Sequence, residues 1–132
     1  MRRHFGFILG ILLLALSLWG QQIRPLTISR ALPGANGTMG VSHDTSGTTY
    51  INLQIKHLAG PEALRPAKAA YVVWVQPPGQ PAQNHGALEV NDKAEAKYST
   101  TTKDRNFELF VTAEDKPDAT TPTGPRLMSA HN

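Results

Sequence analysis

The chain of 132 residues contains no cysteine. This absence excludes disulfide bonds, thiolate catalysis, iron–sulfur clusters and cysteine-ligated zinc sites. The fold must therefore be stabilised by its apolar core, and hydrophobic residues make up 40% of the chain, which is enough for one globular domain. Because charged residues make up only 17%, the composition is not that of a disordered protein.

The chain also lacks any cluster of positive charge. Its 13 lysines and arginines outnumber the 10 acidic residues only slightly, and two of them, Arg2 and Arg3, stand at the very start. The rest of the chain is close to neutral. Binding to nucleic acid needs several cations along one surface to neutralise phosphates. We therefore expect no nucleic-acid partner.

Only one long hydrophobic run is present, from Phe5 to Trp19. It is shorter than the roughly 20 residues of a transmembrane helix, and a basic start with a short apolar stretch is typical of a signal peptide. We predict a signal peptide at residues 1–20, cleaved after Gly20 or after Ser17, and a periplasmic or secreted protein. The alternative is an uncleaved segment, residues 5–19, that anchors the chain in the inner membrane and is its only membrane contact.

No segment shows the period of a long amphipathic helix, and strand patterns are present instead. The stretch TTYINLQIKHL puts Ile51, Leu53 and Ile55 on one side, which is typical of a half-buried antiparallel strand. AAYVVWV (Ala69–Val75) is apolar throughout, so we expect a central strand that is buried on both faces. FELFVTA (Phe107–Ala113) alternates again.

Weaker patterns indicate further strands and the turns between them. We expect strands at residues 86–90, 94–102 and 126–130, and short edge strands at residues 27–29 and 39–41. The dipeptide Asn36-Gly37 is predicted to form a turn, because both residues tolerate positive φ. Residues 21–47 are thus interpreted as a turn-rich segment with at most an edge strand, and residues 48–132 as the folded domain.

Short strands separated by turn signals about every eight to twelve residues predict an all-β fold. We predict an immunoglobulin-like antiparallel β-sandwich of about seven strands, preceded by an N-terminal signal helix. Large side chains inside the strongest strands are the predicted core anchors. They are Tyr71, Trp74, Phe107 and Val111.

Four short motifs follow one another in the second half of the chain. They are Tyr-x-x-Trp (Tyr71, Trp74), Gly-x-Leu (Gly86, Leu88), Phe-x-x-x-Val-Thr-x-Glu (Phe107, Val111, Thr112, Glu114) and Pro-Thr-Gly-Pro (residues 122–125). This order resembles the C-terminal extracytoplasmic domain of anti-sigma-K factors, in its stand-alone exported bacterial form, over residues 48–130. The resemblance implies an exported β-sandwich in which Glu114 completes the end of its strand by hydrogen bonding. It does not imply sigma-factor binding, because that family uses a separate cytosolic helical segment that nothing in this chain matches.

The chain carries the residue types of several active sites without their spacing. Ser42, His43 and Asp44 are neighbours in sequence, whereas a hydrolytic triad takes its members from separate elements. The histidines at positions 43, 57, 85 and 131 are scattered, and no pair has the short spacing of a metal site. We therefore predict no enzyme activity, no cofactor and no metal.

Acidic residues gather near position 115, but Lys116 interrupts them and the glycines of a calcium loop are missing, so we interpret them as a solvated turn. Binding in a β-sandwich falls to the loops at its ends. Residues 77–86 and 115–125 are the two predicted binding loops. The candidate binding residues in or beside them are His85, Glu114, Asp115, Asp118 and Thr123.

These observations favour an exported, non-enzymatic module that binds a protein or glycan partner in the cell envelope. A structural envelope protein without a specific ligand is the first alternative. The extracytoplasmic sensory part of an anti-sigma-type regulatory system is the second.

Overall fold

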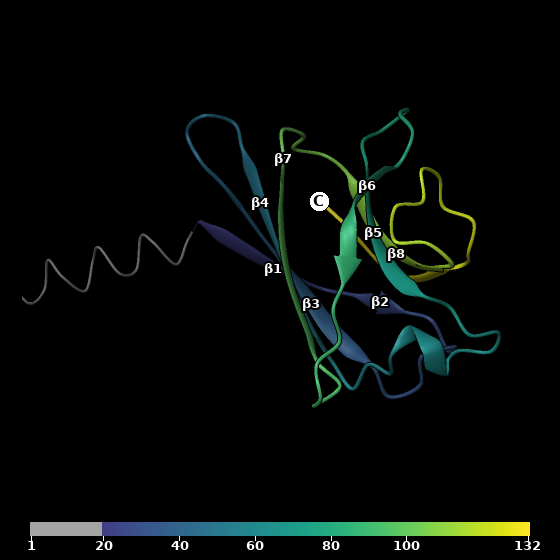
Figure 1. Cartoon of the computed structure of the whole chain (residues 1–132). Coiled ribbons are helices and arrows are strands. Elements are labelled where there is room, and N and C mark those ends of the chain that lie inside the picture. Colours follow the sequence, from purple (N-terminus) through teal and green to yellow (C-terminus); the bar gives the residue numbers. More distant parts are fainter. Residues whose placement is uncertain (1–19) are drawn as a thin grey trace, which may run out of the picture.

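The computed structural model describes residues 20–132, so the signal peptide predicted at residues 1–20 lies, apart from Gly20, outside the described residues. In the described part, nine strands form two antiparallel sheets that pack against each other as a β-sandwich (Figure 1). The first sheet, in the order β1-β3-β4-β7, comprises β1 (Gln21–Pro25), β3 (Asn36–His43), β4 (Thr49–Lys56) and β7 (Ala96–Thr102). The second sheet, in the order β2-β9-β8-β5-β6, comprises β2 (Thr27–Ile28), β9 (Arg126–His131), β8 (Glu108–Glu114), β5 (Ala70–Gln76) and β6 (Gln83–Leu88).

The strands with the strongest sequence patterns are confirmed. In β4, the apolar residues Ile51, Leu53 and Ile55 are buried, and alternate residues such as Gln54 face solvent. β5 is buried on both faces from Ala70 to Val75, as expected for an uninterrupted apolar run. A single 3-10 turn, η1 (Pro61–Ala63), lies in the segment that carries the chain from β4 to β5.

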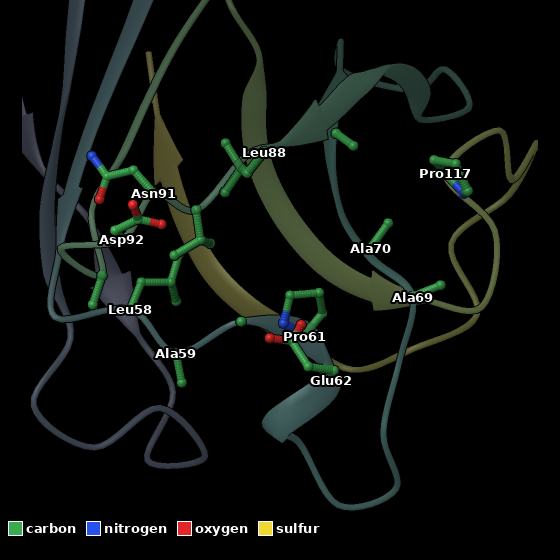
Figure 2. Close-up of a pocket in the computed structure, with 14 residues that line it drawn as sticks. Leu58, Ala59, Pro61, Glu62, Ala69, Ala70, Leu88, Asn91, Asp92 and Pro117 are labelled. Carbon is green, nitrogen blue, oxygen red and sulfur yellow. The ribbon is translucent and has the colours of Figure 1, made fainter.

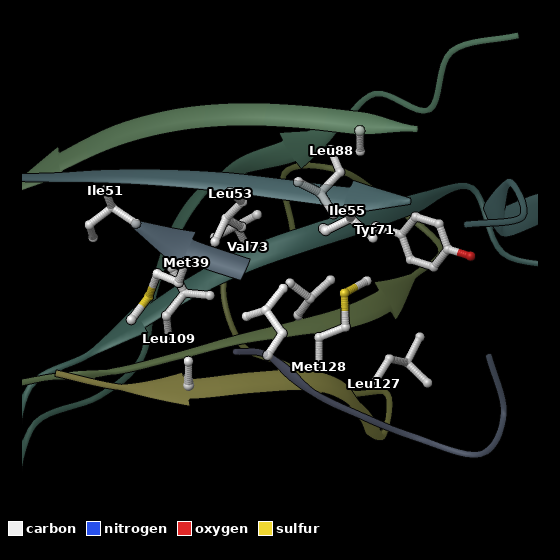
Figure 3. Close-up of a cluster of buried hydrophobic side chains, with 14 of the residues drawn as sticks. Met39, Ile51, Leu53, Ile55, Tyr71, Val73, Leu88, Leu109, Leu127 and Met128 are labelled. Carbon is white, nitrogen blue, oxygen red and sulfur yellow. The ribbon is translucent and has the colours of Figure 1, made fainter. Parts of the chain in front are cut away.

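The main core fills the space between the two sheets (Figure 3). Met39, Ile51 and Leu53 from the first sheet face Val73 and Leu109 from the second, and each is at most 1% exposed. Burial of one such side chain contributes about 1.5–3 kcal/mol. Because the chain has no disulfide bonds, this layer is the main source of its stability.

A second apolar cluster lies on the outer face of the second sheet. Trp74 and Phe110 are stacked there, with ring centroids 6.4 Å apart. Residues 115–125, which we call the covering loop, run over this face and place Ala119 against the cluster (Figure 1, yellow). Trp74 is therefore buried, but in this outer cluster and not between the sheets, whereas Tyr71 and Phe107 lie in the main core.

The predicted turn at Asn36-Gly37 is wrong, because both residues begin the eight-residue strand β3. Gly37 does not have positive φ, and a Cβ on it would lie 2.8 Å from the backbone oxygen of Gln54. The glycine therefore permits close packing between strands. The turn lies two residues earlier, where Gly34 has a φ of +81°.

The sandwich begins at Gln21, whereas the sequence placed its start at residue 48. β1 pairs with β3, and β2 pairs with β9, so the turn-rich segment contributes to both sheets. The strand count in the described residues is therefore nine, compared with the predicted seven or so. Of β3, the sequence predicted only residues 39–41, as an edge strand, whereas the strand has eight residues and lies between β1 and β4.

Candidate functional site

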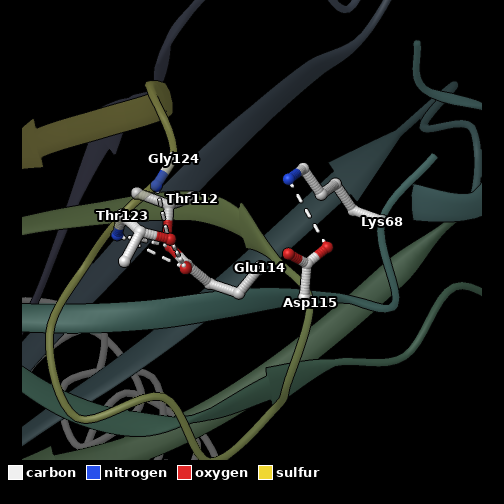
Figure 4. A network of polar contacts seen from close by, with 6 residues as sticks. All are labelled: Lys68, Thr112, Glu114, Asp115, Thr123 and Gly124. Carbon is white, nitrogen blue, oxygen red and sulfur yellow. Dashed lines mark hydrogen bonds and ion pairs between the residues drawn. The ribbon is translucent and has the colours of Figure 1, made fainter. Parts of the chain in front are cut away.

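Two of the predicted binding residues, Glu114 and Thr123, meet in one hydrogen-bond network around the buried Glu114 carboxylate (Figure 4). The Thr123 hydroxyl donates to the Glu114 carboxylate at 2.5 Å, and the backbone amides of Thr123 and Gly124 donate to it at 3.1 and 3.2 Å. The hydroxyl of Thr112 also donates to this carboxylate and in turn accepts the indole N–H of Trp74 at 2.8 Å. Glu114 is only 2% exposed, so these donors replace water around its charge.

The network keeps the Glu114 carboxylate ionised. Burial raises the pKa of this carboxyl, but the hydrogen bonds from Thr112, Thr123 and Gly124 outweigh burial, and the pKa lies below its ordinary value. All the partners come from β8 and from the covering loop. The arrangement therefore holds the end of the covering loop against the second sheet.

Two further contacts hold the covering loop. Asn84 of β6 donates from its side-chain amide to the carbonyl oxygens of Pro117 and Ala119, at 3.0 and 2.8 Å. Asp115 forms an ion pair with Lys68 at 3.4 Å (Figure 4). The covering loop is thus attached at both ends and near its middle, and its contacts are those of a structural element.

The remaining predicted residues lie apart from this network. Asp118 is exposed in the covering loop. His85 lies in β6, where its Nδ1 atom is 3.0 Å from the hydroxyl of Thr100, and burial lowers the pKa of its imidazole although Asp104 opposes this. The hollow beside His85 is lined by residues of β6, β7 and neighbouring turns and by none of the covering loop. The five predicted residues therefore do not form one site.

A larger hollow lies at one end of the sandwich, and the sequence patterns did not predict it (Figure 2). We call it the end groove; its volume is about 620 Å³. It lies between the segment that follows β4, the start of β5, the end of β6 and the turn that follows β6. Its apolar lining includes Leu58, Ala70, Leu88 and Val90, and Pro117 of the covering loop borders it.

Two carboxylates line the end groove from different segments (Figure 2). Glu62 belongs to η1, and Asp92 belongs to the turn after β6. Among residues 20–132, neither of them forms an ion pair, and no lysine or arginine lines the groove. The charge of Glu62 also contributes, after burial, to raising the pKa of Tyr71 to about 12. The end groove is therefore apolar at its base and negatively charged.

Local backbone contacts give the end groove its shape. The Tyr71 hydroxyl donates to the carbonyl oxygen of Ala59 at 2.6 Å, which fixes the segment after β4. The amide of Leu58 donates to the carbonyl oxygen of Ala94 at 2.8 Å and joins that segment to the turn after β6. The side-chain oxygen of Asn91 accepts hydrogen bonds from two backbone amides of this turn. The groove is thus built largely before any ligand arrives.

An apolar base with two carboxylates suits a ligand that combines an apolar group with a positive charge. In the part of the chain that the structure describes, no three histidine, aspartate or glutamate side chains are arranged to hold a metal ion.

Comparison with known proteins adds no relative: no protein-family model matches the chain, and no curated protein matches it significantly. Between residues 20 and 132, no helix has the length and apolar character that crossing a membrane requires.

Proposed function

We propose that this chain is an exported, non-enzymatic β-sandwich module that binds a protein partner in the cell envelope through the end groove. The observation that carries the proposal is the pair of carboxylates, Glu62 and Asp92, without ionic partners beside an apolar base. A protein segment with an apolar side chain next to lysine or arginine matches both features. A neutral glycan would leave the two carboxylates without a counter-charge.

The order of the strands supports an immunoglobulin-like type for the fold. β3 and β4 are neighbours in the first sheet, the chain crosses to β5 and β6 in the second, returns to β7, and ends in β8 and β9. This gives the sets β3-β4-β7 and β9-β8-β5-β6, which correspond to strands A-B-E and G-F-C-C′ of such sandwiches. β1 and β2 are then additions at the edges, and the end groove lies where such folds carry their binding loops.

The size of the end groove sets the scale of the interaction. Its volume lies within the range of about 300–1,000 Å³ typical of ligand sites, so it accommodates one or two side chains and not a whole domain. Two solvent-accessible ion pairs contribute about 1 kcal/mol or less each. We therefore expect an affinity on the order of micromolar, with a clear dependence on salt.

The test uses the full chain, immobilised and exposed to envelope extract, with retained material identified as protein or as glycan. The groove variant carries Glu62→Gln and Asp92→Asn. The matched control carries Gln54→Lys and Thr101→Lys, which add the same net charge on the exposed face of the first sheet. We expect a stoichiometric protein that the groove variant loses and the control retains.

Three outcomes contradict the proposal. If the groove variant retains the protein as well as the control does, binding lies elsewhere on the molecule. If neither protein nor glycan is retained above background by the unchanged chain, the structural alternative replaces the binding module. Retention of a glycan in place of a protein contradicts the assignment of the partner.

A further inference from the structure

β1 forms a free edge of the first sheet. It pairs with β3 on one side, and among residues 20–132 nothing pairs with its other side. All five of its residues are exposed, and Ile23, at 68%, is the most exposed large hydrophobic residue of the described chain. Proteins usually protect such an edge with charged side chains, proline or a bulge. In β1 only the last two residues, Arg24 and Pro25, are of this kind.

The opposite edge of the first sheet shows what protection looks like. There β7 lies beside β6 of the second sheet, and the Tyr98 hydroxyl donates to the carbonyl oxygen of His85. The imidazole of His85 also contacts the Thr100 hydroxyl. These contacts close that side of the sandwich, whereas β1 has no comparable cover in the described residues.

The hydrogen bonds between β1 and β3 determine which way the N–H and C=O groups of β1 point. The amide of Leu26 donates to the carbonyl oxygen of Gly37, which marks this pair as hydrogen-bonded. In an antiparallel ladder such pairs alternate with non-bonded pairs, so Gln22 and Arg24 bond to β3. The N–H and C=O groups of Gln21 and Ile23 therefore point to the free edge.

We propose that two copies of this chain associate by antiparallel pairing of β1 with β1 about a two-fold axis centred on Ile23. Ile23 of each copy exchanges two backbone hydrogen bonds with its equivalent. The amide of Gln21 donates to the carbonyl oxygen of Pro25 in the second copy. Because proline has no N–H, Pro25 has no backbone donor that would need an acceptor in this pair. The two first sheets then form one continuous sheet of eight strands.

The side chains fit this register. The two Ile23 side chains become cross-strand neighbours on the outer face, which removes the most exposed apolar group from water. Arg24 lies opposite Gln22 of the second copy, so no like charges face each other. Within one chain Arg24 already donates to the Gln22 amide oxygen at 3.0 Å, which shows that this pair of side chains is compatible.

The association is weak and independent of the end groove. Five residues on each side bury less than the roughly 1,200 Å² of a standard stable interface, so dimers form only at high local concentration. No residue of β1 lines the end groove. Failure of either proposal therefore leaves the other unaffected.

Sedimentation velocity of the chain, purified as the producing cells process it, tests the pairing from micromolar to near-millimolar concentration. Ile23→Pro removes the N–H that points to the free edge and breaks no hydrogen bond to β3. Edge strands accept proline at such positions. Ile23→Lys places two like charges opposite each other. Gln54→Lys is the matched control, because it adds the same charge to the same face on a central strand. We expect dimers for the unchanged chain and the control, and at least a roughly tenfold higher dissociation constant for both Ile23 variants.

Amide hydrogen exchange gives a second measurement that does not depend on the folding of a variant. We expect protection of the Ile23 amide to rise with protein concentration, while the Gln22 and Arg24 amides, bonded within the chain, stay constant. A monomer at every concentration overturns the proposal. So does a dimer that the Ile23 variants leave unchanged, or an Ile23 amide whose protection does not respond to concentration.

Discussion

The two sheets of this sandwich share one core but differ on their outer faces. In the first sheet the outer face presents Asn52, Gln54 and Lys56 of β4 to solvent, and its sequence alternates strictly. In the second sheet the outer face of β5 carries Ala70, Val72 and Trp74, all at most 7% exposed. The first sheet meets water directly, whereas the second is covered by a loop of its own chain (Figure 1).

The difference shows how the loop and the strand depend on each other. An apolar outer face needs a cover, and the covering loop cannot supply a strand because its prolines lack N–H donors. The loop is held instead by side chains that reach its backbone, above all the Glu114 carboxylate and the Asn84 amide. The acidic, proline-rich stretch after β8 is therefore part of the fold, and the binding that we propose is assigned to the end groove beside it.

The largest effect should come from removing the aromatic centre of the covered face. Trp74→Ala creates a cavity in a fully buried site and deprives the Thr112 hydroxyl of a donor, so we expect a loss of about 3–5 kcal/mol in unfolding free energy. Tyr50→Ala, on the exposed face of the first sheet, should cost less than about 1 kcal/mol. Urea unfolding of the two variants measures the contrast, and equal losses would show that the two faces do not differ.

The attachment of the covering loop should give the next largest effect. Glu114→Ala leaves the hydroxyl of Thr112 and the amides of Thr123 and Gly124 without their acceptor, and we expect a loss of about 2–3 kcal/mol. Asp118→Ala, in the same loop but exposed, should stay within about 0.5 kcal/mol. A Glu114 variant as stable as the Asp118 variant would refute the attachment.

The same carboxylate should make the stability depend on pH. Because the pKa of Glu114 is lower in the folded state than its ordinary value of 4.5, its contribution is complete above that pH. The contribution is lost as the pH falls through the folded-state value. Unfolding free energies should therefore differ between the unchanged chain and Glu114→Gln at pH 6, and the two should converge in strong acid. A constant difference across this range is the contrary result.

A smaller effect should follow from the middle of the covering loop. Asn84→Ala removes the two hydrogen bonds to the covering loop and the one that the Gly86 amide donates to the Asn84 side-chain oxygen, and we expect a loss of about 1 kcal/mol. Cleavage within residues 115–125 by a protease should become faster, because this part of the loop is held chiefly by Asn84. Limited proteolysis with Gln83→Ala, an exposed neighbour, as control measures this; equal cleavage rates would count against the role of Asn84.

The pattern of apolar residues in the sequence predicted those strands in which this pattern directly reflects which sides of the strand are buried. β4 alternates because one side is wet, and β5 is continuous because the covering loop encloses its second side. β3 was predicted only in part, as an edge strand at residues 39–41, because its glycines indicate turns in most contexts. Here Gly37 permits close packing against Gln54, and Gly40 leaves room for the side chain of Gln21, which local sequence does not reveal.

Local sequence patterns could not predict the end groove, for a different reason. Glu62 and Asp92 are about thirty residues apart in the sequence, and each lies in a segment whose sequence is typical of an ordinary polar turn. They line the same groove, and the hydrogen bond between Leu58 and Ala94 joins their segments. By contrast, Glu114 and Thr123 were selected from the sequence as binding residues, and the structure places them in the network that attaches the covering loop.

The most direct test of this division between structure and function is an amide chemical-shift map of the chain, titrated with the partner that the capture experiment identifies. We expect shifts centred on residues 58–62 and 88–94, with the outer face of the first sheet unchanged. We also expect Glu62→Gln with Asp92→Asn to abolish these shifts. Shifts centred on the exposed tip of the covering loop, and insensitive to the two carboxylates, would refute binding at the end groove.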